Sequence, residues 1–293
     1  MTHVLITGAD GQLGYELQRT APDFATLFCT DYRQLDITSE AAIQAFFKTS
    51  KPAVVINGAA YTAVDKAETD IDTARAVNAT GAELLAKACA ASKIPMVQVS
   101  TDFVFSGRQS TPYRGDDQPS PLSVYGQTKL EGENHVRELL PDSSLIIRTA
   151  WVYSAHGHNF VKSMLRLMQE KEQLGVVADQ VGSPTWANHL AQCVWNGAVH
   201  LLEGRLQTPV HHYTDAGVAS WYDFAVAIQE EAQQLGLLDK AIPVNPIQTM
   251  DYPTPAKRPA YSVLDKTTSW SELAAPKVHW QVALRSMLAE LCR

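Results

Sequence analysis

The first half of the chain alternates between two patterns of hydrophobic and polar positions. Short apolar runs rich in β-prone residues predict five strands, at residues 3–7, 25–30, 53–57, 96–100 and 144–148. Longer segments with apolar residues at helical spacing lie between them, at residues 12–20, 39–49, 73–91 and 125–139. Strand–helix alternation favours right-handed crossovers, so we expect an α/β fold with a doubly wound parallel sheet, covered by helices on both faces.

Beyond residue 150 this alternation weakens. Helical patterns continue, but Pro-containing loops such as residues 252–255 and 257–259 separate them. The four helical segments are residues 159–171, 186–202, 220–235 and 279–292. We therefore expect a smaller, mainly helical C-terminal lobe, with some of its segments returning to the sheet.

Composition narrows the class of protein. Of 293 residues, 45% are hydrophobic and 19% are charged, which is ordinary for a globular protein. The net charge is −7 and the basic residues are scattered, so no nucleic-acid partner is expected. The four cysteines lie far apart, and neither a signal-peptide pattern nor an apolar run of roughly 20 residues occurs. We expect a cytoplasmic protein that does not bind membranes.

Glycines follow the first predicted strand in the run Gly8-Ala9-Asp10-Gly11-Gln12-Leu13-Gly14. A glycine turn between a strand and a helix allows close backbone approach, and the free N–H groups of the helix attract a pyrophosphate. The alternative is a tight turn that needs glycine for its geometry alone. The context predicts a Rossmann-type NAD(P)-binding domain over residues 1–150, with residues 151–293 forming mainly the substrate-binding lobe.

Acidic residues after the second predicted strand bear on the choice of cofactor. Asp31 has the position expected of a carboxylate that accepts a hydrogen bond from the ribose 2′-OH of NAD, while Arg33 could accept the 2′-phosphate of NADP. Both NADPH and NADH therefore stay open. Asp36 and Ile37 could frame the adenine, although Asp36 could equally be a turn or capping residue.

Small residues end the third predicted strand. Ala59, Ala60 and Thr62 lie in the run 57–62, and their size would let a cofactor lie against the chain. Simple close packing is the alternative explanation. These three residues complete the predicted cofactor site.

Candidate catalytic residues follow the fourth strand and begin the next helix. Thr101 ends the strand, and Tyr125 and Lys129 are spaced i and i+4, so they emerge from one helix face. A neighbouring ammonium would lower the pKa of the phenol toward the working pH. Thr101 can hold a carbonyl oxygen while Tyr125 donates a proton to it, which is the chemistry of ketone reduction.

These motifs together resemble the short-chain dehydrogenase/reductase superfamily. The resemblance implies that Lys129 also contacts the nicotinamide ribose and that an asparagine, here Asn78, supports the site.

Longer runs resemble the dTDP-4-dehydrorhamnose reductase family along nearly the whole chain. They include residues 62–68, 100–107, 148–153, 159–162, 179–185 and 252–259. The resemblance implies reduction of the 4-keto group of dTDP-6-deoxy-L-lyxo-4-hexulose by NADPH or NADH, giving dTDP-L-rhamnose for cell-surface polysaccharides.

The same resemblance implies the residues that contact the nucleotide sugar. Thr101 and Asp102 would face the sugar, and Tyr125 would protonate its 4-oxygen. Trp151 would contact the ring, because an indole offers an apolar face to a deoxysugar; a core position is the alternative. Arg258 could pair with the diphosphate or could tie down the C-terminal loop.

Members of this family resemble metal-linked dimers. The ligand positions here are Glu16, Asn188 and Glu290, and Asn188 departs from the expected carboxylate. We expect no catalytic metal and regard a homodimer as possible.

Two other functions remain open from the sequence. A nucleotide-sugar epimerase or dehydratase would share the tyrosine and lysine but would return the hydride, without net consumption of NAD(P)H. A non-catalytic subunit, resembling the regulatory subunit of methionine adenosyltransferase, would bind a partner protein instead.

Overall fold

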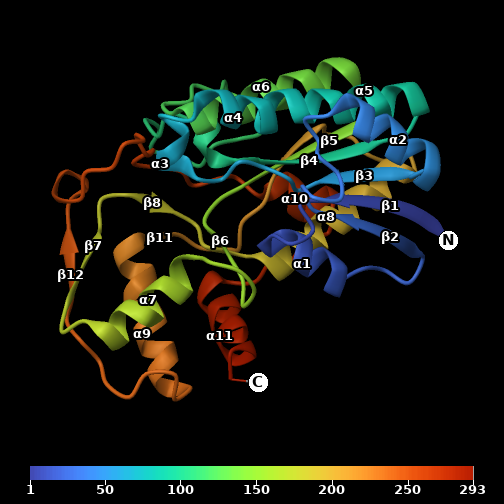
Figure 1. Ribbon diagram of the computed structural model, residues 1–293. Helices are drawn as coiled ribbons and strands as arrows, with labels where there is room; N and C mark the ends of the chain where they lie inside the picture. The colour runs from blue at the N-terminus through green and yellow to red at the C-terminus, as the bar shows by residue number, and fades with distance from the viewer. Residues whose placement is uncertain (293) are drawn as a thin grey trace.

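A parallel sheet of six strands forms the centre of the structure, a computed structural model that describes residues 1–292 (Figure 1). Its spatial order is β10-β5-β4-β3-β1-β2, and every pairing in it is parallel. The strands are β1 (Thr2–Thr7), β2 (Ala25–Thr30), β3 (Val54–Asn57), β4 (Met96–Thr101), β5 (Ser144–Thr149) and β10 (Val210–His212). The chain passes from β1 outward to β2 and then crosses to β3, so the order reverses beside β1. This confirms the expected doubly wound fold.

Helices cover both faces of the sheet. One layer consists of α2 (Glu40–Ser50), α5 (Gly81–Ser92) and α6 (Val124–Leu139), and the opposite layer of α1 (Gln12–Arg19) and α8 (Ala187–Leu202). Successive strand residues point to opposite faces: Leu5 packs with Leu85 of α5, whereas Val4 and Ile6 pack with Leu190 of α8. The inner strands β1, β3, β4 and β5 are thus buried on both sides, which explains their continuous apolar runs, whereas the edge strand β2 is mostly half-buried.

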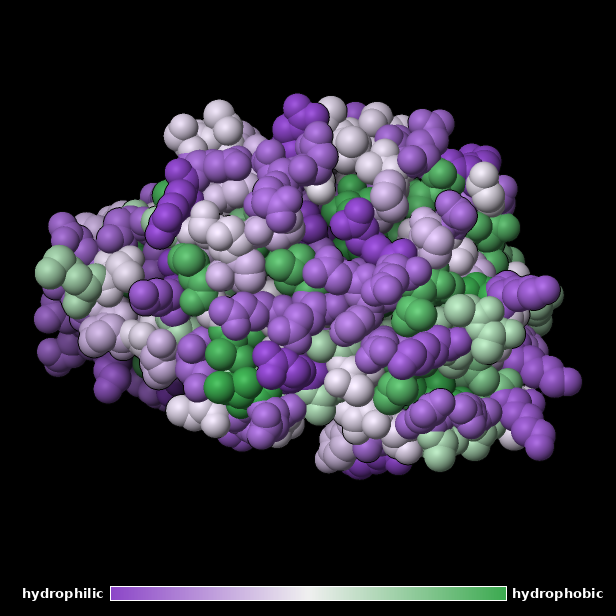
Figure 2. Space-filling model, turned by 90° about the horizontal axis from the view of Figure 1, so that it is seen from above, coloured by the Kyte–Doolittle hydropathy of each residue, from purple (hydrophilic) through white to green (hydrophobic). Residues whose placement is uncertain are grey.

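The outer surface of the α5 and α6 layer faces solvent. Seen from above, it is mostly hydrophilic, with hydrophobic residues interspersed among hydrophilic ones (Figure 2). The inner faces of these helices carry the buried residues, such as Leu85, Ala86, Cys89 and Val136. Amphipathic helices on a buried sheet are the arrangement that the sequence pattern predicts.

Three segments of the C-terminal half extend the sheet or pack on it. Helix α8, which the sequence pattern placed in the small lobe, packs on β3, β4 and β5 and against α1. Strand β10 adds a sixth strand beside β5, and α10 (Thr267–Glu272) packs beside β10. Helical spacing shows which face of a segment is apolar but not which surface it covers, so the sequence alone did not indicate which segments return to the sheet.

A smaller lobe holds the rest of the C-terminal half (Figure 1). A separate hydrophobic core, with Val161, Phe224, Ile228 and Leu284, joins its three main helices. The helices are α7 (Phe160–Glu170), α9 (Trp221–Gln234) and α11 (Trp280–Glu290). Short strands pair beside them: β6 (Val152–Tyr153) with β9 (Thr185–Trp186), β7 (Leu174–Val177) with β12 (Val244–Ile247), and β8 (Val181–Gly182) with β11 (Ala219–Ser220).

The helix expected over residues 73–91 is interrupted. It comprises α4 (Ile71–Arg75), a π-helical turn η1 (Ala76–Thr80) and α5. A π-helical turn inserts an extra residue per turn and is frequent at functional sites. Three short elements complete the chain: α3 (Val64–Ala67) and the 3₁₀ turns η2 (Asp102–Val104) and η3 (Thr249–Asp251).

Candidate active site

One cleft of about 830 Å³ lies at the carboxyl ends of the central strands, where the order of the sheet reverses. Ligands of doubly wound sheets bind at this position. The predicted residues that line it are Gly8, Asp10, Gly11, Gln12, Leu13, Gly14, Asp31, Asp36, Ile37, Ala59, Ala60, Thr62, Thr101, Asp102, Tyr125, Lys129 and Trp151. Tertiary structure therefore brings together residues that the sequence spreads over about 140 positions.

The three glycines of the first turn serve different purposes. Gly8 has φ +69°, and a Cβ there would lie 2.8 Å from the Ala59 backbone. A Cβ on Gly14 would lie 2.3 Å from the Gly8 carbonyl oxygen, so the turn itself requires glycine there. A Cβ on Gly11 would approach only that same oxygen, at 3.2 Å. Internal packing thus demands Gly8 and Gly14, whereas Gly11 leaves one side of the turn open to the cleft.

Helix α1 begins at this turn with its N–H groups exposed to the cleft. In the described structure, its N-cap residue, Gly11, has no side chain that could accept a hydrogen bond from the free N–H groups. The first turn of the helix also contains no acidic residue. The helix N-terminus therefore keeps its donors and its positive dipole end for an anion. This observation fits the pyrophosphate of a dinucleotide.

Asp31 and Arg33 meet at the adenosine end of the cleft. Asp31 is 7% exposed and accepts from Arg33 Nε at 2.8 Å and from Nη2 at 2.5 Å. Nη2 also donates to Asp10 Oδ2 at 3.2 Å. The bond from Arg33 lowers the pKa of Asp31, which keeps this carboxylate ionised. Asp31, which can accept a hydrogen bond from the ribose 2′-hydroxyl of NADH, thus lies beside Arg33, which can bind the 2′-phosphate of NADPH. This arrangement fits either cofactor.

Asp36 has a local structural role in addition to lining the cleft. Its Oδ1 accepts from the Thr38 backbone N–H at 2.9 Å and from the Thr38 hydroxyl at 2.7 Å. These are turn-stabilising bonds. Ile37 packs beneath Gly81, whose missing Cβ leaves it room.

The catalytic helix begins beside the fourth strand. Ser123 caps α6 by accepting from the Gly126 N–H at 3.2 Å. A Cβ on Gly126 would lie 2.2 Å from the Phe103 carbonyl oxygen, so glycine allows α6 to approach η2 closely. Tyr125 and Lys129 consequently line the cleft on the same side as Thr101.

Hydrogen bonds hold these side chains in place. Lys129 Nζ donates to the Val99 carbonyl oxygen at 2.7 Å. The Thr101 hydroxyl donates to Asp102 Oδ1 at 3.0 Å and accepts from the Phe103 N–H at 3.2 Å. Within residues 1–292, the other carboxylate oxygen of Asp102 is buried without a partner. A buried oxygen of this kind is ready to accept a hydrogen bond from a ligand.

Burial dominates the ionisation of the site. It raises the pKa of Tyr125 to about 12, and the Asp102 charge adds to this rise while the Thr101 hydroxyl opposes it. Burial also lowers the pKa of Lys129 to about 8 and raises that of Asp102 to about 6. The expected lowering of the Tyr125 pKa by Lys129 is therefore not what the structure shows. Desolvation of the phenolate outweighs the ammonium, which donates to the Val99 carbonyl.

Asn78 supports the cleft from the π-helical turn. Its Oδ1 accepts from the Tyr61 N–H at 2.8 Å, and its Nδ2 donates to the Tyr61 carbonyl at 3.2 Å and to Thr128 Oγ1 at 3.2 Å. It thereby ties the loop after β3 to α6. The role of a supporting asparagine fits these bonds.

Trp151 lines the cleft in an unusual backbone conformation. Its φ is +49°, and its ring stacks on Trp221 with centroids 3.6 Å apart and planes 11° apart. Gly182 makes room, because a Cβ there would lie 2.7 Å from the indole. A bulky residue holds a positive φ only where its surroundings impose it, which is typical of functional positions.

Arg258 does not line the cleft. Its guanidinium donates to Asp65 Oδ1 at 2.9 Å and to Oδ2 at 2.7 Å, and it also contacts Thr254 Oγ1. The C-terminal loop is thus tied to α3, which is the second of the two roles that the sequence left open. Its pairing with a diphosphate stays a prediction.

Two further residues of the cleft, Gly157 and His158, were not identified from the sequence. Their loop reaches the glycine turn: His156 Nε2 lies 3.0 Å from the Asp10 carbonyl oxygen, and Asn159 donates to Gln12 at 2.9 Å. In the sequence, the run His156-Gly157-His158 is the local feature that could have indicated this loop.

Two of the three positions that the resemblance offers for a metal link, Glu16 and Glu290, pair with an arginine. Arg19 contacts Glu16 at 3.2 Å and Glu290 at 2.9 Å, while Asn188 donates to Glu16 Oε2 at 3.0 Å. Among residues 1–292, no cluster of three His, Cys, Asp or Glu side chains suited to a metal is found. The donor set does not fit a divalent cation, because the arginine supplies the positive charge.

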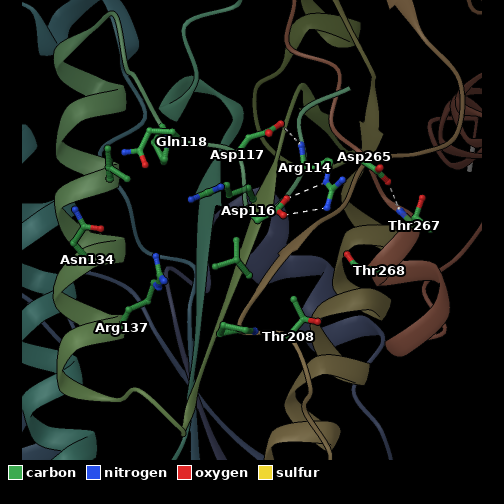
Figure 3. A pocket seen from close by; sticks show the side chains of 16 residues that line it. Arg114, Asp116, Asp117, Gln118, Asn134, Arg137, Thr208, Asp265, Thr267 and Thr268 are labelled. Atoms are coloured by element: carbon green, nitrogen blue, oxygen red, sulfur yellow. Dashed lines mark hydrogen bonds and ion pairs between the residues drawn. The ribbon is translucent and has the colours of Figure 1, made fainter. Parts of the chain in front are cut away.

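A second cavity, of about 800 Å³, lies between α6 and the edge strand β10 (Figure 3). Asn134 and Arg137 reach it from α6, and Arg114 and Asp116 pair across its rim at 3.0 Å. The buried Arg148 forms part of its floor. The glycine turn and the predicted catalytic residues line the other cleft.

The fold and the first cleft define a nicotinamide-dependent oxidoreductase of the short-chain dehydrogenase/reductase type. The RmlD substrate binding domain family matches residues 1–293. A dTDP-4-dehydrorhamnose reductase from Aggregatibacter actinomycetemcomitans is 41% identical over 99% of both chains, and one from Escherichia coli K12 is 37% identical over 99% of this chain and 98% of that protein. The chain belongs to the dTDP-4-dehydrorhamnose reductase family.

Solved structures agree with this assignment. A dTDP-4-dehydrorhamnose reductase from Clostridium acetobutylicum is 41% identical, with a TM-score of 0.91 and full coverage of both chains. One from Bacillus anthracis, in complex with NADP, is 34% identical with a TM-score of 0.90, covering 99% of this chain and 100% of that one. A UDP-glucose 4-epimerase from Thermus thermophilus, 18% identical over 99% of both chains with a TM-score of 0.82, shares the fold.

Proposed function

We propose that this chain reduces the 4-keto group of dTDP-6-deoxy-L-lyxo-4-hexulose with NADPH or NADH, giving dTDP-L-rhamnose. One observation carries the proposal. Thr101, Tyr125 and Lys129 share a cleft with a glycine turn suited to a pyrophosphate, in a chain that belongs to this reductase family along its whole length. The relatives named above that are more than 30% identical are dTDP-4-dehydrorhamnose reductases, and one of them is in complex with NADP.

Each proposed catalytic residue has a separate role in the reduction. When bound, the nicotinamide supplies a hydride to the carbonyl carbon. Tyr125 donates its phenolic proton to the 4-oxygen, and the raised pKa of about 12 keeps that proton in place until the oxygen becomes basic. Thr101 would turn its hydroxyl proton from Asp102 Oδ1 to the same oxygen and orient it. Lys129, as an ammonium, orients the cofactor ribose and favours the phenolate that remains.

Substrate contacts follow from the sugar end of the cleft. Asp102 would accept a hydrogen bond from a sugar hydroxyl through Oδ2, which is buried and has no hydrogen-bond partner among residues 1–292. Trp151, stacked on Trp221, offers an apolar wall to the deoxysugar. Arg258 would have to leave Asp65 to reach a diphosphate, so we assign it a diphosphate contact only as the weaker part of the proposal.

Either cofactor fits the proposed site. Asp31 would accept from the 2′-hydroxyl of NADH, whereas Arg33, which is 68% exposed, would turn toward the 2′-phosphate of NADPH. The reaction as proposed uses no metal, since hydride transfer to a ketone does not require one.

The test is direct turnover. The purified protein is mixed with dTDP-6-deoxy-L-lyxo-4-hexulose, generated enzymatically in place, and the absorbance of NADPH or NADH is followed while the sugar product is identified. Stoichiometric oxidation with formation of dTDP-L-rhamnose supports the proposal. Tyr125→Phe should lower turnover by about 10²–10⁴-fold. Tyr252→Phe, which removes the hydroxyl of a 61% exposed tyrosine, should match the parent.

Other outcomes of this assay would indicate one of the two alternative functions. Conversion of a nucleotide sugar without net cofactor oxidation would indicate an epimerase or a dehydratase. Tight cofactor binding without turnover of any keto sugar, together with a copurifying enzyme, would indicate a regulatory subunit.

The proposed setting is the cytoplasm, with the product entering polysaccharide synthesis. The cysteines support a reducing compartment, because Cys29, Cys89, Cys193 and Cys292 are all free thiols. Within the described residues, no helix is long and apolar enough to cross a membrane. We also propose a homodimer, without a metal link because Arg19 already joins Glu16 and Glu290; sedimentation with and without a chelator tests both points.

A further inference from the structure

A buried ion pair lies one helical turn behind Lys129. Glu133 follows Lys129 on α6, and the two residues are 1% and 4% exposed. Arg148, on β5, donates from Nη2 to Glu133 Oε2 at 2.7 Å and from Nε to Oε1 at 3.0 Å. Such a fully desolvated pair is costly to form and contributes little net stability, so its presence calls for another explanation.

Arg148 is held on its other sides as well. Its Nη1 lies 3.4 Å from His212 Nε2, and its guanidinium lies over the Phe105 ring at 5.1 Å. His212 Nδ1 lies 2.9 Å from the Tyr113 carbonyl oxygen, which assigns the proton to Nδ1 and leaves Nε2 as an acceptor. Burial and Arg148 lower the pKa of His212 to about 3, so its ring is neutral. The arginine therefore holds the Glu133 carboxylate in one place.

Titratable groups lie around Lys129 on several elements. On α6, Tyr125 lies one turn before it and Glu133 one turn after it, and Asp102, the first residue of η2, lines the same cleft as Lys129. Arg148 on β5 lies behind Glu133, and the neutral His212 on β10 lies behind Arg148.

The carboxylates of the neighbouring elements are engaged elsewhere. Glu68 accepts from the Val124 N–H at the first turn of α6, at 2.8 Å. Glu131, on the outer face of α6, pairs with Arg75 of α4 at 3.0 Å. Glu133 is therefore the buried carboxylate closest along the helix to the lysine.

We propose that Glu133 and Arg148 are a positioning pair for Lys129. Glu133 supplies the negative charge that keeps the buried lysine an ammonium, and Arg148 holds that carboxylate one turn away. The inference rests on the proposed function, in which the Lys129 ammonium acts. A carboxylate without Arg148 would pair directly with Lys129, because residues at i and i+4 reach each other. The lysine would then leave the Val99 carbonyl and the cleft.

Removal of Glu133 and removal of Arg148 should shift the pKa of Lys129 in opposite directions, because the two side chains carry opposite charges. Burial holds the pKa of Lys129 near 8, and the Glu133 charge works against this lowering. Glu133→Gln removes the negative charge and leaves Arg148, so the pKa of Lys129 should fall by about one pH unit or more. Arg148→Met removes the positive charge and frees Glu133, so the pKa should rise. The alkaline limb of kcat/KM should move in the same directions.

The pKa of Lys129 is measured in the full chain by NMR of ¹³Cε-labelled lysine, with the Lys129 signal assigned from its loss in Lys129→Arg. Glu131→Gln is the matched control, since it breaks an exposed ion pair on the same helix, and it should leave the Lys129 titration unchanged. Opposite shifts in the two buried variants support the pair as proposed. Unchanged values, or shifts in the same direction, overturn it.

Loss of one partner of a buried pair can prevent folding. The double variant E133Q/R148M removes both charges together, and replacement of a buried ion pair by uncharged side chains is often well tolerated. Its Lys129 should titrate below the parent value, because Glu133 is the charge that acts on the lysine. A value equal to or above the parent overturns the proposal. The NMR titration does not need turnover, so a parent that fails to oxidise NADPH rejects the proposed function and still leaves this inference decided.

Discussion

Substitution of two glycines in the same turn should separate folding from cofactor binding. Gly14→Ala places a Cβ 2.3 Å from the Gly8 carbonyl oxygen and 2.5 Å from the Ala9 Cα, and both contacts are with backbone. Overpacking of this kind costs about 3 kcal/mol. Alanine recovers about 1 kcal/mol through its helix propensity. The net loss of stability is about 2 kcal/mol, which lowers the Tm of a chain of this length by about 3 °C.

Gly11→Ala should behave differently. Gly11 has φ −74° and ψ 170°, which alanine adopts freely, and its Cβ would approach only the Gly8 oxygen, at 3.2 Å. Lower entropy of the unfolded chain offsets a weaker N-cap, so stability should change by less than about 1 kcal/mol. The new methyl group lies on the open side of the turn, where the proposed site would hold the pyrophosphate. The Kd for NADPH should rise at least about tenfold, equivalent to about 1.4 kcal/mol.

Thermal unfolding with and without NADPH measures both effects. Gly14→Ala should unfold at lower temperature even without cofactor. Gly11→Ala should have the parent Tm without cofactor but a smaller rise when NADPH is added, because ligand stabilisation depends on the ratio of ligand concentration to Kd. A Gly14→Ala protein as stable as the parent would refute the packing argument. Parent-like NADPH affinity in Gly11→Ala would refute the assignment of the turn.

Three other changes test the cleft. Tyr125→Phe should lower turnover by about 10²–10⁴-fold while the Kd for NADPH stays within about twofold, measured by stopped-flow and by titration. Asp31→Ala should raise the Kd for NADH by about tenfold and that for NADPH less; equal losses would contradict the ribose contact. The pKa of Asp102 is raised from 3.8 to about 6, so the folded state binds the extra proton between these values and stability falls as pH rises through them. Asp102→Asn should therefore raise stability by about 3 kcal/mol at pH 7.5 and leave it unchanged below pH 4, as chemical unfolding at the two pH values will show.

Much of the fold could be predicted from the sequence, because it depends on local patterns of apolar and polar residues. Five of the six strands of the sheet are apolar on both faces, and the helices between them have one apolar side, so pattern alone predicts the layers. The glycine turn and the pair Tyr125 and Lys129 are also local features, because a turn needs particular residues and i, i+4 spacing defines one helix face. The parallel topology then places their ends at a common edge.

Contacts between distant residues decided the rest. Strand β10 has three residues, too few for a pattern, and its pairing with β5 makes it a strand. Arg258 could be read in two ways until Asp65, 193 positions away, was found beside it. The pKa of Tyr125 depends on desolvation more than on the nearby lysine, and burial is a property of the folded chain. The sequence determined which groups are present and in what order, whereas tertiary packing decided which of them lose water and which charges they meet.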